Sequence, residues 1–323
     1  MKRARFVRVP IFLFFCLAPL AIHARESAPA ALKTFLEHEG FGGAPLQRRL
    51  GNHLFVTTLM NGRRTALMID TGSPRTLIDR GTADALGLFV RPTSVPVGGV
   101  WGRKPERYGV SQLATLTMGN CTFKDVPITV ADESDINKGR GRHLDGLFGA
   151  HEMSKFGIIV DCTRQMIYVN PRGPSAAMTQ KLAAFLGSKG FVRIPMTFNA
   201  QNHLTIEAAL NGHPTRLIVD TGSSTTLLAS TIARQDAVSL SPLNIKLHDK
   251  TAGIVPVNIG HVQQLTLGDL KIPNAEVVVA NVSQMVGAGL LGEEYLSWNF
   301  GIVDVGGMNL YLRPPEPTRA KKR

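Results

Sequence analysis

The sequence is poor in cysteine, with three in 323 residues, and no cysteines and histidines are grouped at the spacing of a zinc site. Cys16 lies in an apolar N-terminal stretch, which leaves Cys121 and Cys162 for the rest of the chain. In an oxidising compartment these two are able to form a disulfide. An equal alternative is a pair of half-buried thiols that act as small apolar residues. The sequence therefore predicts no metal site and leaves the state of the two thiols open.

Long apolar runs are also scarce, because the only one lies at the N-terminus. Basic residues within 1–8 precede the apolar residues 9–22, and small residues follow. This order is typical of a secretory signal peptide, which we place at residues 1–24. The apolar run is shorter than a membrane-spanning helix, which needs about 20 residues, and an uncleaved signal anchor is the alternative. We expect a protein secreted across the inner membrane into the periplasm, attached to a membrane only through such an anchor.

Acidic residues are fewer than basic ones, which gives a formal net charge of +12. Part of this excess lies in the signal peptide and in a basic tail at the C-terminus. Neither basic segment alternates with aromatic residues, as a nucleic-acid-binding surface does, so we expect no nucleic-acid partner. With 44% hydrophobic and 19% charged residues, the chain is able to bury a real core.

What the sequence does contain is a tandem repeat. A shift of 150 residues aligns 32–41 with 182–191, and 52–73 with 202–223, without a gap. Later segments of the two halves also match, with small offsets. The sequence therefore predicts one structural unit written twice.

The repeat and the local composition divide the chain into five segments. These are a signal peptide, an N-terminal domain, a linker, a C-terminal domain and a basic tail, at residues 1–24, 25–170, 171–180, 181–312 and 313–323. Short runs rich in Val, Ile and Thr predict strands at 53–60, 65–70, 112–118, 126–131, 157–161 and 166–169, with counterparts in the second half. Short helices are expected at 32–38, 81–86 and 182–187. An Asn-Gly pair in each half marks the first hairpin turn.

Each unit carries an aspartate directly after an apolar strand, at the start of a tight turn. The turns read DTGS at 70–73 and again at 220–223. An apolar-Gly segment follows further along each unit, at 147–149 and 290–292. A buried carboxylate is costly unless several donors surround it, so a duplicated one indicates a function. One such turn is weak evidence, whereas two turns with two downstream segments form a strong signal.

These motifs resemble the aspartic proteases, in particular their bacterial retropepsin-like branch, with two domains fused as in pepsin. The resemblance covers nearly all of residues 50–312. It implies an all-β, bilobal acid-protease fold of two tandem-duplicated retropepsin-like β-barrel lobes, each with short helices. It also implies an aspartic endopeptidase that acts on a peptide or protein substrate without a cofactor. Because one chain holds both halves of the site, we expect a monomer.

By this resemblance, Asp70 and Asp220 form a catalytic dyad. Two like charges about 3 Å apart do not both ionise readily, so the pair holds one proton, and aspartic proteases are a standard example of this effect. One carboxylate then acts as the base on a bound water, while the protonated one polarises the scissile carbonyl. No metal or covalent intermediate is required, and the apparent pKa values belong to the pair.

Six neighbouring residues are expected to support the dyad: Thr71, Gly72, Ser73, Thr221, Gly222 and Ser223. The glycines permit a tight turn and let backbone N–H groups approach the carboxylates. The resemblance implies that the threonines exchange hydrogen bonds across the lobe interface. The serine hydroxyls are expected to donate to the outer carboxylate oxygens. The apolar-Gly segments are expected to pass behind the turns and support them.

Flaps that cover the substrate are expected between the active turn and a later strand of each lobe. In the first lobe the glycine-rich segment 97–103 includes Gly99 and Trp101, and in the second lobe Gly253 lies in segment 250–256. Trp101 is the candidate for contact with substrate. An equal alternative is a tryptophan that caps a surface hairpin, since the pepsin flap motif is absent.

Other features carry weaker signals. Residues 287–292 match the dinucleotide pattern G-x-G-x-x-G, but no βαβ unit surrounds them, so we expect no cofactor. His53 and His203 are duplicated and are expected to be structural. Arg75 has Thr225 as its counterpart and is expected to tune one side of the cleft. The alternative function is a catalytically silent acid-protease fold that serves as an exported peptide- or protein-binding module. The presence of both aspartate turns favours the enzyme.

Overall fold

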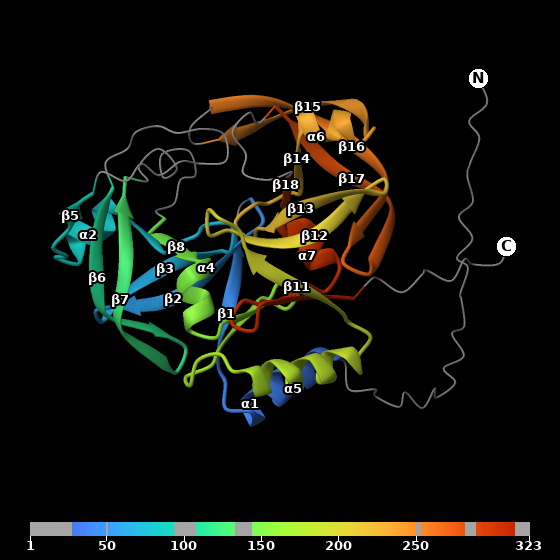
Figure 1. The fold of residues 1–323 in the computed structure, drawn as a ribbon. Coiled ribbons are helices and arrows are strands. Elements are labelled where there is room, and N and C mark those ends of the chain that lie inside the picture. The colour runs from blue at the N-terminus through green and yellow to red at the C-terminus, as the bar shows by residue number, and fades with distance from the viewer. Residues whose placement is uncertain are drawn as a thin grey trace, which may run out of the picture.

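The computed structural model describes residues 28–49, 51–93, 108–132, 144–249, 253–281 and 289–313. The expected signal peptide, the segment around Trp101 and the end of the basic tail lie outside these residues. The structure is mostly β, with 52% strand and 18% helix. Figure 1 shows two lobes, with the helices α1 and α5 side by side beneath them. The predicted all-β, two-lobed fold is confirmed. No helix of the described ranges is long and apolar enough to cross a membrane.

The N-terminal lobe is a closed barrel of six strands. In order around the barrel they are β2 (His53–Met60), β3 (Arg63–Asp70), β8 (Gly146–Gly149), β4 (Leu77–Asp79), β7 (Cys121–Ala131) and β6 (Gly109–Met118). Each strand pairs with the next, and β6 pairs back to β2. The short β5 (Arg91–Pro92) pairs with the start of β6. A closed ring leaves no free sheet edge, so the end of β3 is held rigidly from both sides.

The C-terminal lobe repeats this topology. Its ring consists of β12 (Leu204–Leu210), β13 (His213–Val219), β18 (Gly289–Leu291), β14 (Leu227–Ala229), β17 (Leu270–Ala280) and β16 (Gly253–Leu267). The pairings close in the same order, with β16 returning to β12. A long β15 (Ser239–Asp249) pairs with β16 and extends beyond the barrel. The tandem repeat of the sequence is therefore a repeat of barrels.

A third sheet, antiparallel throughout, joins the two lobes. Its order is β1 (Gly42–Arg49), β10 (Met166–Val169), β9 (Ile159–Asp161), β19 (Ile302–Asp304), β20 (Asn309–Leu312) and β11 (Val192–Phe198). The central β9–β19 pair belongs half to each lobe and places Val160 opposite Val303. The outer strands β1 and β11 continue into their own barrels by pairing with β2 and β12. The shared sheet thus fixes the lobes to each other.

Two helices cover the outer face of this shared sheet. They are α1 (Ala28–His38) and α5 (Ala176–Gly187), and their Phe35 and Phe185 rings stack with centroids 4.3 Å apart. Leu36 of α1 and Leu186 of α5 are buried against the sheet, together with Tyr311 of β20. Both helices begin earlier than predicted, and α5 begins inside the expected linker. The reason is that Ser175 caps α5 by accepting a hydrogen bond from the Met178 N–H, 3.2 Å away.

In the part of the chain that the structure describes, four shorter helices follow the barrel strands: α2 (Arg80–Ala85), α4 (Ala150–Lys155), α6 (Ser230–Gln235) and α7 (Glu293–Trp298). Only α2 was predicted, one residue later than it lies. The predicted hairpin turns are present, since Asn61 and Gly62 have φ of 47° and 81°, and Asn211 and Gly212 have 51° and 87°. Left-handed backbone at both central residues is the requirement of a tight type I′ hairpin.

The two cysteines outside the predicted signal peptide are free thiols, both buried. Burial raises the pKa of Cys121 and of Cys162, which keeps both protonated. The structure therefore favours the alternative in which they fill the core as small apolar residues.

A buried ionic cluster crosses between the lobes on one side. Arg48 of β1 lies 2.9 Å from the carboxylate of Glu293, at the start of α7, and donates to the Cys162 carbonyl at 2.7 Å. Burial raises the pKa of Glu293 to about 7, although Arg48 opposes this shift. The residue equivalent to Arg48 in the C-terminal lobe is Phe198 of β11. The residue equivalent to Glu293 in the N-terminal lobe is the buried Ala150, at the start of α4. The residues at the two equivalent positions are thus apolar and carry no ion pair.

Candidate active site

The two DTGS turns meet between the lobes, where hydrogen bonds join them in a reciprocal pattern. The Thr71 N–H donates to Thr221 Oγ1 at 3.1 Å, and the Thr221 N–H donates to Thr71 Oγ1 at 3.0 Å. Each hydroxyl also donates to a carbonyl of the opposite lobe, Thr71 to Val219 at 2.7 Å and Thr221 to Ile69 at 2.8 Å. Both threonines are fully buried. The structure contains the exchange that the resemblance implied, and it locks the turns together.

The glycine of each turn faces the aspartate of the opposite lobe. A Cβ atom added to Gly72 would lie less than 3.0 Å from the carboxyl group of Asp220. A Cβ atom on Gly222 would meet Asp70 in the same way. Neither glycine has a positive φ among the described residues. Glycine is therefore required here for close approach between the lobes, which adds a reason that the sequence did not supply.

The two carboxylates are held by different numbers of donors. Asp70 Oδ1 accepts the Ser73 N–H at 2.9 Å. Asp220 Oδ1 accepts two backbone donors, the N–H of Gly222 at 2.8 Å and of Ser223 at 3.1 Å. Asp220 is buried and Asp70 is half-buried. The dyad is therefore not symmetric, because the environment favours charge on Asp220.

Family models match each half of the chain around one of these turns. An aspartyl protease model matches residues 56–151, and a gag-polyprotein putative aspartyl protease model matches residues 206–298. Together they cover more than half of the chain, and each includes one aspartate of the dyad. The chain belongs to the retropepsin-like aspartic protease family. It carries two domains of that family.

Solved structures include a similar protein, a retropepsin-like aspartic protease from Rickettsia conorii. It is 19% identical in sequence, and the match covers 40% of this chain and 91% of that chain, with a TM-score of 0.30. A search of curated proteins found no match.

In this retropepsin-like protein the pKa of both aspartates lies above that of an ordinary aspartate. Burial raises the pKa of Asp70, and the negative charge of Asp220 raises it further. Burial also raises the pKa of Asp220, which the N–H of Gly222 and the hydrogen bond from Asp70 oppose. The two groups therefore titrate as a coupled pair, and the additional backbone donor at Asp220 favours the negative charge on that side. Both apparent pKa values remain properties of the pair.

The predicted role of the serine hydroxyls is wrong. Ser73 Oγ donates to the Arg75 carbonyl at 2.9 Å, and Ser223 Oγ donates to the Thr225 carbonyl at 2.8 Å. The backbone N–H of each serine, not its hydroxyl, reaches the carboxylate. A serine hydroxyl easily reaches the backbone carbonyl two residues further along the chain. Each serine makes this local hydrogen bond in place of one to the aspartate carboxylate.

Removal of these hydroxyls is therefore expected to leave the pH dependence of activity unchanged. The double variant Ser73→Ala, Ser223→Ala should lose about 1 kcal/mol of stability per hydrogen bond and keep both limbs of its pH–rate profile. The measurement is kcat/KM against pH beside the unmodified chain. An upward shift of both limbs by about one pH unit, the size of a lost charged hydrogen bond, would show that the hydroxyls reach the dyad after all.

The apolar-Gly segment of the N-terminal lobe lies directly behind its turn. Gly149 N donates to Thr76 Oγ1 at 3.2 Å, and Ala150 N donates to the Ser73 carbonyl at 2.8 Å. The carboxylate of Glu152, which is 1% exposed, accepts the Thr76 N–H at 2.7 Å. The support expected of this segment is thus present, and a buried glutamate, which the sequence analysis missed, completes it.

The C-terminal lobe uses the same arrangement with a different spacing. Gly292 N donates to Thr226 Oγ1 at 3.0 Å, and Glu293 N donates to the Ser223 carbonyl at 2.9 Å. The Thr226 N–H donates to Glu294, whose pKa is raised by burial. Glu152 follows its glycine by three residues and Glu294 by two, so a fixed-offset comparison does not align them. An acidic residue within one helical turn of each apolar-Gly segment is the signal that was available.

The duplicated histidines differ in position. His203 Nδ1 lies 2.8 Å from the carbonyl oxygen of Gly72, so it contacts the active turn of the opposite lobe. His53 is buried in β2. Of the flap candidates, Gly99 and Trp101 lie outside the described residues, and Gly253 opens β16 opposite Asp249. The substrate-binding roles of these residues stay predictions.

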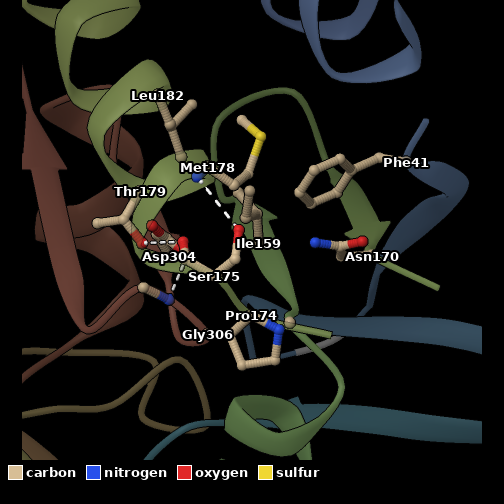
Figure 2. Close-up of a pocket in the computed structure, with 12 residues that line it drawn as sticks. Phe41, Ile159, Asn170, Pro174, Ser175, Met178, Thr179, Leu182, Asp304 and Gly306 are labelled. Carbon is tan, nitrogen blue, oxygen red and sulfur yellow. Dashed lines mark hydrogen bonds between the residues drawn. The ribbon is translucent and has the colours of Figure 1, made fainter. Parts of the chain in front are cut away.

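Two of the cavities lined by described residues differ greatly in size. Figure 2 shows the smaller one beneath α5, where Met178, Leu182 and Phe41 line a space of about 10 Å³. Such a volume admits a single water at most, so this cavity is not a substrate site.

The larger cavity, of about 620 Å³, lies beside the active turn of the N-terminal lobe, and Ser73 of that turn is one of the residues that line it. No group of three or more His, Cys, Asp or Glu in the described ranges is placed to hold a metal ion.

Proposed function

We propose that this protein is an aspartic endopeptidase whose dyad, Asp70 and Asp220, activates a water molecule that hydrolyses a peptide bond. The observation that carries the proposal is the pair of carboxyl groups fixed on one axis by the reciprocal hydrogen bonds of Thr71 and Thr221. A buried pair of coupled carboxyl groups costs stability, and such pairs are characteristic of catalytic sites. We further propose that the protein acts after export to the periplasm.

The asymmetry of the donors assigns a role to each carboxyl group. Asp220, the charged member, accepts a proton from the bound water while the water oxygen attacks the scissile carbonyl carbon. Asp70 gives its proton to the carbonyl oxygen, which yields a neutral gem-diol. Asp220 then gives its proton to the leaving nitrogen while Asp70 takes a proton from one hydroxyl of the gem-diol. The C–N bond breaks, and the dyad again holds one proton. Each step moves a proton between the dyad and the substrate, and none requires a covalent intermediate.

The test is incubation of the purified chain, without residues 1–24, with a mixed peptide library over a range of pH. New internal cleavage sites are expected, with loss of all products in the Asp220→Asn variant. Products that persist in that variant at the rate of the unmodified chain would contradict the role of Asp220 as the base. A chain that binds peptides and never cuts them would instead support the binding-module alternative.

Activity is expected from a monomer. The shared sheet and a single connection supply both aspartates from one chain, so no subunit association is needed. Specific activity should therefore stay constant on dilution through the nanomolar range, while sedimentation shows one chain per particle. A fall in specific activity that follows the dissociation of a dimer would contradict this expectation.

A further inference from the structure

We propose that Arg75 selects substrates that place an acidic side chain in the cavity beside the N-terminal active turn. The inference rests on the proposed peptidase function and deepens it by naming a substrate class. Arg75 lies two residues beyond Ser73, and both line this cavity of about 620 Å³. A side chain that enters the cavity would thus lie beside the reacting centre.

The walls of the cavity are largely apolar. Leu77 and Tyr108 are buried, and Ile128 and Val110 of the neighbouring strands complete this wall. Gln201 enters from the opposite lobe, so the cavity lies at the lobe boundary and not on an outer face. Apolar surroundings exclude water and strengthen an ion pair formed with a guanidinium at the rim.

Among the described residues that line the cavity, two are charged, Arg75 and Glu152. The Glu152 carboxylate is 1% exposed and accepts the Thr76 N–H, so its charge is turned into the protein. Arg75 is exposed, and its guanidinium has no carboxylate partner within the described part of the chain. Its carbonyl is occupied by Ser73 Oγ, which fixes the backbone and leaves the side chain available. The cavity therefore offers one unpaired cation.

An arginine is suited to this task because its planar fork matches a carboxylate with two parallel hydrogen bonds. The equivalent residue of the C-terminal turn is Thr225, whose hydroxyl lies 3.4 Å from Glu294. The two sides of the cleft thus differ in charge. The acidic preference is expected at a single position on one side of the scissile bond, and not at its mirror position.

The test compares peptides that differ only by Glu or Gln at the position that enters the cavity. The full chain should favour the Glu peptide in kcat/KM by up to about fivefold, since an ion pair at a partly exposed site contributes up to about 1 kcal/mol. Arg75→Thr, which copies the opposite turn, should bring this ratio to about one, chiefly through slower cleavage of the Glu peptide. Arg75→Glu should make the enzyme prefer a third peptide, with Lys at the same position, over the Glu peptide.

Arg64→Thr is the matched control, because Arg64 is an exposed arginine on β3 that does not line the cavity. It should keep the Glu preference. A preference that survives Arg75→Thr, or that is absent from the full chain, overturns this inference while cleavage itself upholds the peptidase function. Absence of cleavage for every peptide would overturn the peptidase function first.

Discussion

Replacing either dyad carboxyl by its amide is expected to abolish peptide hydrolysis and to stabilise the fold at neutral pH. Asp70→Asn removes the proton that polarises the substrate carbonyl, and Asp220→Asn removes the base. Each loss should lower kcat/KM by about 10²- to 10⁴-fold, the usual contribution of general acid–base catalysis. The measurement is hydrolysis of one defined peptide at the pH optimum of the unmodified chain.

The gain in stability follows from the direction of the pKa shifts. Burial raises the pKa of both carboxyl groups above that of an unfolded aspartate, about 3.9. Such groups stabilise the fold fully below the unfolded pKa, and this contribution is lost as the pH rises through the folded pKa. The unmodified chain should therefore lose stability between about pH 4 and neutrality, and each amide variant should lose less.

Thermal unfolding of the three proteins against pH measures this effect. Asp84→Asn is the control, because Asp84 is an exposed carboxylate on α2 that is remote from the dyad in the barrel. It should change neither activity nor the slope of Tm against pH. An amide variant of the dyad that is less stable than the unmodified chain at neutral pH, or that retains hydrolysis, would refute the shared-proton model.

A single methyl group at Gly72 or Gly222 is expected to have an effect nearly as large. The added Cβ atom would overlap the carboxyl group of the opposite lobe, so the lobes must separate or the aspartate must turn away. Overpacking of this kind costs about 1–3 kcal/mol. A displacement of about 1 Å in a catalytic group lowers the rate by about 10²-fold, so activity should fall at least that far.

Gly187→Ala provides the matched comparison. Gly187 ends α5, and a Cβ atom there would meet nothing within 4 Å. The variant should keep full activity and gain up to about 1 kcal/mol, because alanine is the better helix former. Urea midpoints and kcat/KM of the variants decide the matter. Gly72→Ala with normal activity would mean that the turns are further apart than the structure shows.

The parts of the fold that could be predicted are those marked in the sequence by the repeat, by turn residues or by runs of strand-forming residues. The 150-residue repeat, the Asn-Gly hairpins and strands such as β2 and β10 are visible in this way. Strands β4 and β8 have three and four residues and, unlike the equally short β10 with its neighbour β9, belong to no local hairpin, so no turn signal marks them. Their pairing partners lie far along the chain, so only the closed barrel defines them.

The candidate site shows the same division. The DTGS turns identified Asp70 and Asp220, and the family resemblance implied the bonds between Thr71 and Thr221. The direction of the Ser73 hydroxyl was mistaken, because the choice between a nearby carbonyl and a carboxylate depends on torsion angles that the sequence does not encode directly. Glu152 was missed because its partner, the Thr76 N–H, is 76 residues away.

The buried contact between Arg48 and Glu293 has a consequence for self-assembly. In a homodimer of one lobe, each residue occurs on both sides of the twofold axis. Two N-terminal lobes would then place Arg48 against Ala150, and two C-terminal lobes would place Glu293 against Phe198. Either pairing leaves a buried charge without its counter-ion, which is strongly unfavourable. The two halves are thus mutually complementary and each is incompatible with its own copy, so one lobe produced alone should not form an active homodimer.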